Sequence, residues 1–111
     1  MSLEHAGDLL PGTLDLLILK AVAGGRMHGY GIAQHLKLVS GAVLDVGESS
    51  LYPALQRLLL HDHLAAEWGV SENNRRARYY TITKGGRKQL AAERAEFERM
   101  VGAIMRVLAT A

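Results

Sequence analysis

Residues 49–83, SSLYPALQRLLLHDHLAAEWGVSENNRRARYYTIT, decide the fold, because the spacing of their apolar residues changes partway along. From residue 49 to about 61 the leucines recur at the three- and four-residue spacing of a helix. Residues 64–70 and 78–82 then alternate with a period of two, which predicts two strands. The polar stretch between the strands is rich in residues that accept tight turns. We therefore predict a helix followed by a β-hairpin with a basic tip.

Two further helices are predicted before this stretch. Residues 13–23 place their leucines, isoleucine and valine on one helical face, and Thr13 is the expected N-cap. After a turn at residues 25–29, a second helix has Ile32, Leu36 and Val39 on its buried side. A helix that supports a second, exposed helix is the order found in helix-turn-helix proteins.

A last, long helix follows the hairpin, and Thr83 is its expected N-cap. The fold class is therefore mainly α with a small β-hairpin, namely a winged helix-turn-helix plus a long C-terminal helix. We divide the chain into a flexible N-terminal arm (1–11), a winged helix-turn-helix DNA-binding domain (12–83) and a C-terminal dimerisation helix (84–111).

The composition fits one small globular domain and excludes several kinds of site. The chain has 111 residues, 13 Lys and Arg against 11 Asp and Glu, a net charge of +2 and no cysteine. Without cysteine there is no disulfide, thiolate zinc site, iron–sulfur cluster or cysteine nucleophile. No apolar run approaches the roughly 20 residues of a membrane span. We expect a soluble cytoplasmic protein that does not bind membranes.

The charge is unevenly distributed, and this points to a polyanion as partner. Residues 73–92 contain six basic residues and no acidic one. These are Arg75, Arg76, Arg78, Lys84, Arg87 and Lys88. A basic run is more often a solvated loop than a binding site, but its position directly after a helix-turn-helix pattern favours a nucleic-acid contact.

The residues around the hairpin fit double-stranded DNA. Leu51, Leu55 and Leu58 form the buried stripe of the preceding helix, so its polar side chains lie on the exposed side. A major groove admits one such helix, and Gln56 and Arg57 have the chemistry to read adenine or guanine. A basic wing beside it contacts the backbone or the minor groove. The predicted DNA-binding residues are Ser49, Ser50, Tyr52, Pro53, Gln56 and Arg57 on recognition helix 49–61, with Asn74, Arg75, Arg76, Arg78 and Lys84 on or beside wing 71–78.

The C-terminal helix carries an apolar stripe that predicts a homodimer. The stripe consists of Phe97, Met100, Val101, Ile104 and Leu108. In a monomer it would be exposed to water unless it folded back on its own domain. We favour dimerisation because the first three helices already fill one core and small domains gain most from association.

Several segments together resemble one known family, the PadR family of transcriptional regulators. The resemblance rests on residues 51–58 (LYPALQRL), Trp68 and residues 76–86 (RARYYTITKGG), with further similarity at residues 28–32 (HGYGI) and 12–19 (GTLDLLIL). It extends from about Leu10 to the end of the chain. It implies a bacterial repressor that dimerises through its C-terminal helix, binds an operator, and commonly controls its own promoter and genes of detoxification or transport. The single C-terminal helix resembles the small subfamily.

The resemblance leaves room for a small apolar effector between the subunits. Some small PadR-like regulators stack flat compounds on a tryptophan of the C-terminal helix, which this helix lacks. We expect Trp68, in the first strand, to belong to the core. Phe97, Met100 and Met105 at helical spacing are typical of packing rather than of a ligand site.

Two other classes of function deserve comparison. An enzyme is not expected, because the chain has no G-x-S-x-G elbow, P-loop or dinucleotide fingerprint. We expect no metal and no cofactor, since His61 and His63 at the end of a helix rarely converge on one ion. The alternative is a winged-helix module that binds protein or RNA without an operator, and the salt dependence of binding distinguishes it from a DNA-binding protein.

Overall fold

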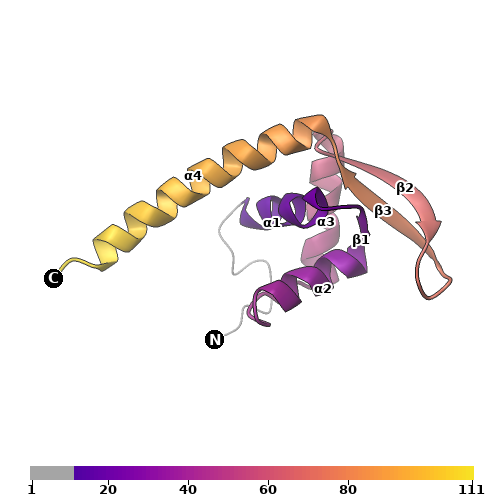
Figure 1. Cartoon of the computed structure of the whole chain (residues 1–111), viewed down its shortest axis with the longest axis horizontal. Coiled ribbons are helices and arrows are strands. Elements are labelled where there is room, and N and C mark those ends of the chain that lie inside the picture. Colours follow the sequence, from indigo (N-terminus) through magenta and orange to yellow (C-terminus); the bar gives the residue numbers. More distant parts are fainter. Residues whose placement is uncertain (1–11) are drawn as a thin grey trace.

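The computed structural model describes residues 12–111 and has a winged helix-turn-helix fold, as predicted. Within that range its elements are α1 (Thr13–Ala23), β1 (Met27–His28), α2 (Gly29–Val39), α3 (Glu48–Leu60), β2 (Leu64–Val70), β3 (Arg76–Ile82) and α4 (Lys84–Leu108). Figure 1 shows α1, α2 and α3 bundled together, with the β2–β3 hairpin extending to one side and α4 to the other. The arm predicted over residues 1–11 lies outside the described range. No helix from Thr13 onward is long and apolar enough to cross a membrane.

The sheet has one strand more than the sequence predicts. Its antiparallel order is β1-β3-β2, with Met27 opposite Tyr80 and His28 opposite Tyr79. The prediction of a simple turn at residues 25–29 is therefore wrong. A strand of two residues is too short to show a period in the sequence, and it forms because β3 offers a free edge beside the start of α2.

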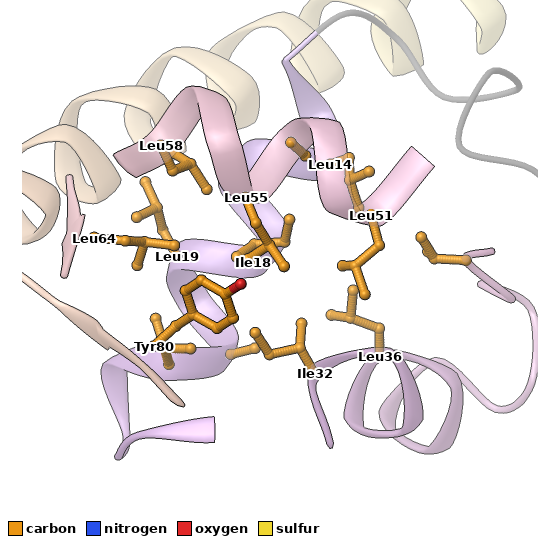
Figure 2. Packing of buried hydrophobic residues seen from close by; sticks show 14 residues of the cluster. Leu14, Ile18, Leu19, Ile32, Leu36, Leu51, Leu55, Leu58, Leu64 and Tyr80 are labelled. Carbon is orange, nitrogen blue, oxygen red and sulfur yellow. The ribbon is translucent and has the colours of Figure 1, made fainter. Parts of the chain in front are cut away.

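The core lies where the three-helix bundle meets the base of the hairpin. Ile18 from α1, Ile32 from α2 and Leu55 from α3 are fully buried, and Tyr80 from β3 lies among them (Figure 2). The leucine stripe predicted for α3 is buried, which confirms that helix and its orientation. The prediction that Val39 lies on the buried side of α2 is wrong, since this residue is 71% exposed. It is the last residue of α2, so no further turn holds that side of the helix against the core.

The two predicted helix caps have different outcomes. Thr83 caps α4 as expected, because its Oγ1 accepts a hydrogen bond from the Gly86 backbone N–H at 2.9 Å. The prediction for Thr13 is wrong. It is the first helical residue of α1, and the N-cap is Gly12, which has a φ of 83° and makes no side-chain cap. A left-handed φ at this position favours glycine, which accounts for the shift by one residue.

Trp68 is not a core residue, contrary to expectation. It lies on the same face of β2 as Leu64, but the exposed fraction along that face rises from 2% at Leu64 to 59% at Trp68 and 62% at Val70. The reason is that the hairpin is longer than the bundle that it packs against, as Figure 1 shows. The base of the hairpin closes the core. The outer half of the hairpin projects beyond the bundle, and the face that carries Trp68 is turned toward α3.

Candidate nucleic-acid interface

A groove of about 570 Å³ lies between α3 and the hairpin. Tyr52 and Gln56 line it from α3, and Tyr30 lines it from the first turn of α2. The opposite wall is the projecting half of the hairpin, from which Trp68 and Arg76 face inward. The groove thus combines aromatic rings and amide groups with the cations of the wing, and it is open to solvent along its length.

The helical wall presents the side of α3 that the leucine stripe leaves exposed. Pro53 and Gln56 are exposed, and Tyr52 is 48% exposed at the edge nearest the hairpin. Ser49 and Ser50 lie in the first turn of α3 and do not line the groove. An exposed amide such as that of Gln56 is able to donate and accept at once, which is what adenine requires in a major groove.

The wing arginines are held by aromatic rings of the same face. The Arg76 guanidinium lies over the Trp68 ring, 4.2 Å from its centroid, and Arg78 lies 5.9 Å from the centroid of Tyr80. The register explains these contacts, because Trp68 is paired with Arg78 and all four side chains belong to the inner face of the hairpin. Stacking leaves the N–H groups at the rim of each guanidinium available to an anion.

The tip of the wing is a tight turn that exposes its polar residues. Asn74 has a φ of 59°, a conformation that asparagine accepts more readily than most residues. Ser71 closes the turn, since its backbone N–H donates to the Arg75 carbonyl at 2.8 Å. Asn74 and Arg75 are both exposed, so the tip carries a cation to the outermost point of the hairpin.

Several residues that line the groove are not among the predicted DNA-binding residues, including Tyr30, His28 and Glu72. His28 Nδ1 accepts from the Gly31 backbone N–H at 3.0 Å and so caps α2, which leaves its proton on Nε2. That nitrogen lies 3.8 Å from Oε1 of Glu72 in the wing turn. The short strand β1 brings His28 and Tyr30 to the groove, because its pairing with β3 holds the start of α2 beside the hairpin.

Lys84 and Arg57 are among the predicted site residues that lie apart from the groove. Lys84 is the first residue of α4 and is separated from Arg76 by the length of β3, about 20 Å at roughly 3.3 Å per residue. Arg57 lies on the flank of α3 that faces α1. Its Nη2 and Nε donate to the two carboxylate oxygens of Asp15, at 2.8 and 3.3 Å. This hydrogen bonding raises the pKa of Arg57, while partial burial opposes the rise.

The predicted dimerisation stripe lies on the projecting part of α4. Leu90, near the start of α4, packs against the core, whereas Met100, Val101 and Ile104 are 44%, 38% and 43% exposed. Together with Phe97 and residues of α1 they line an apolar hollow of about 180 Å³. No residue between Gly12 and Ala111 covers this stripe further.

The histidines considered as metal ligands do not form a site with other groups. His61 and His63 stack with their ring centroids 5.8 Å apart. Among residues 12–111 no three histidine, cysteine or acidic side chains lie close enough together to hold a metal ion.

Comparison with known proteins gives a consistent result. The sequence profile of the transcriptional regulator PadR-like family matches residues 18–92. The structure is similar to that of a transcriptional regulator from Clostridium thermocellum (27% identity, 89% of this chain and 96% of that chain, TM-score 0.80). It is also similar to a PadR-like transcription factor from Bacteroides fragilis (28% identity, 86% and 90%, TM-score 0.70). An uncharacterized protein from Lysinibacillus sphaericus is 28% identical over 88% of this chain and 93% of its own length.

Proposed function

Because the chain belongs to the PadR-like family of transcriptional regulators, we propose that it represses transcription in the cytoplasm by binding an operator as a homodimer. The family consists of regulators that bind DNA, not of enzymes. The observation that carries the proposal is the groove between α3 and the wing, where the exposed helix that carries Gln56 faces the wing arginines.

The two walls of the groove have separate tasks in this proposal. α3 enters the major groove of B-form DNA, where Gln56 contacts the edge of a base, with Tyr52 beside it. Arg75, Arg76 and Arg78 follow the sugar–phosphate backbone or enter the minor groove next to it. Residues 12–83 then form the DNA-binding unit, and Lys84 is too far along β3 to share a phosphate with Arg76.

Dimerisation is the task that we assign to α4, residues 84–111. The exposed stripe from Phe97 to Leu108 suits packing against the same stripe of a second copy, as in an antiparallel or crossed helix pair. The hollow between α1 and α4 is where a small apolar effector would enter. A symmetric dimer would present two copies of α3 to successive major grooves, which are about 34 Å apart.

The test compares two substitutions that affect different walls. Arg76→Ala removes a phosphate contact, so the slope of log K against log salt flattens by about 0.9 and affinity falls on every sequence. Gln56→Ala instead reduces the preference for the operator over a scrambled duplex. Arg106→Ala is the matched control, because it also removes one exposed positive charge but lies near the far end of α4.

The outcome also separates DNA binding from the alternative function. A winged-helix module that recognises protein or RNA would bind the operator duplex no better than the scrambled one. It would lose nothing specific on Gln56→Ala. Equal binding to both duplexes, together with no change of preference in Gln56→Ala, would favour the protein- or RNA-binding module over operator binding.

A further inference from the structure

Arg57 is the only basic residue in α3, and it is not free. Its guanidinium makes a two-pronged contact with the Asp15 carboxylate, 2.8 Å at the shorter arm. A guanidinium that spans both oxygens of one carboxylate has the best geometry for this ion pair, which offsets its charge and holds it on the α1 side of α3. The Asp15 side chain is 26% exposed, so water competes for it only in part.

The position of Asp15 adds to the strength of this contact. Asp15 lies in the first turn of α1, where the helix dipole favours a negative charge. The helix dipole therefore favours the ion pair at this place beside α3. The two residues are 42 positions apart in the sequence, so their contact holds the flank of α3 against α1.

The wing arginines, Arg75, Arg76 and Arg78, differ from Arg57 because no carboxylate of residues 12–111 pairs with them. Arg76 and Arg78 lie over aromatic rings instead, which leaves their charge uncompensated. The protein thus keeps the cations of the wing available and neutralises the single cation of the helix.

We propose that Asp15 withholds Arg57 from DNA, so that α3 enters the major groove without a free cation. This inference rests on the proposed DNA binding. Arginine is the side chain that most commonly reads guanine, through O6 and N7, whereas a glutamine such as Gln56 suits adenine. Phosphate attraction then comes from the wing, and α3 adds contacts that depend on sequence.

The test measures the salt dependence of binding for variants of both partners. In Asp15→Asn the carboxylate charge is lost and Arg57 becomes available to a phosphate. The slope of log K against log salt should steepen by about 0.9, so that raising the salt fourfold weakens this variant about 3.5-fold more than the unmodified protein. Affinity should rise on operator and scrambled duplexes alike. Arg57→Ala, and the double variant, should keep the unmodified slope.

Controls separate failure of this inference from failure of the proposed function. Arg76→Ala should flatten the slope in every background, and Asp15→Glu, which keeps the charge, should leave it unchanged. A flattening by Arg57→Ala equal to that of Arg76→Ala would mean that Arg57 already contacts phosphate, and the inference would be wrong. An unchanged slope in folded Asp15→Asn would also overturn it. Absence of salt-dependent binding in the unmodified protein would overturn the proposed function and this inference with it.

Discussion

Ile104→Glu is the substitution that we expect to separate the proposed dimer into monomers. Ile104 lies in the middle of the α4 stripe and is 43% exposed in a single copy. A symmetric interface contains each residue twice, so the change introduces two carboxylates at the same contact. The winged helix-turn-helix body should stay folded, because Ile104 lies in the C-terminal half of α4 and outside the core cluster.

The size of the effect follows from the surface that Ile104 still exposes. Complete burial of an isoleucine side chain is worth about 1.5–3 kcal/mol. The exposed 43% therefore corresponds to roughly 1 kcal/mol in each copy and about 2 kcal/mol in the dimer. Burying two carboxylates without partners costs at least about 2 kcal/mol more. A total near 4 kcal/mol weakens the dimer roughly 1000-fold.

Sedimentation equilibrium over a concentration series measures this change directly. Arg106→Gln is the control, since it alters the net charge by the same −1 at an exposed position on the opposite face of α4. Circular dichroism reports whether the helices persist in the variant. If folded Ile104→Glu sediments as the same dimer as the unmodified protein, the stripe is not the interface and the reasoning is refuted.

Three further predictions concern the junction with α4, the wing and the core. Gly86→Ala should lower stability by about 1–3 kcal/mol in thermal unfolding, because the added Cβ would overlap the His63 carbonyl oxygen. Gly85→Ala is the control and should not lower stability, because its added Cβ would make only ordinary contacts. Equal melting temperatures for the two variants would contradict the packing described. The fluorescence of Trp68, the single tryptophan, should change when DNA fills the groove, and an unchanged spectrum at saturation would remove the wing from the interface. Burial raises the pKa of Tyr80 above its ordinary value of 10.0, with Arg78 opposing the rise. The contribution of Tyr80 to the free energy of unfolding should therefore be fully present below pH 10.0 and be lost as the pH rises through the folded-state pKa. Denaturant titrations at several pH values should show this loss in the unmodified protein and not in Tyr80→Phe.

The sequence predicts the structure best where a local period decides it, although the cap expected at Thr13 is one residue off. The leucine stripe of α3 predicted both the helix and its buried side, since burial of that stripe is what orients the helix. Thr83 was found as a cap for the same reason, because its partner lies three residues away. The two strands of the hairpin followed from alternation, and together these elements define the winged helix-turn-helix fold.

The sequence is least informative where contacts distant in sequence decide the outcome. Trp68 follows the alternation of a buried face, but the length of the hairpin relative to the bundle leaves it exposed. The ion pair of Arg57 with Asp15 on another helix has no local signal in the sequence, and whether Arg57 contacts DNA stays a prediction. The pairing of β1 with β3, which adds Tyr30 and His28 to the groove, leaves no periodic trace in two residues.

The most direct test of operator binding is a fluorescence-anisotropy titration of the protein against the duplex upstream of its own gene. A scrambled duplex of equal length is the control, and both are measured at two salt concentrations. We predict tighter binding to the upstream duplex and an affinity that falls steeply as salt rises. No binding to either duplex at low salt would contradict the account, because the unpaired arginines of the wing would then have no DNA to contact.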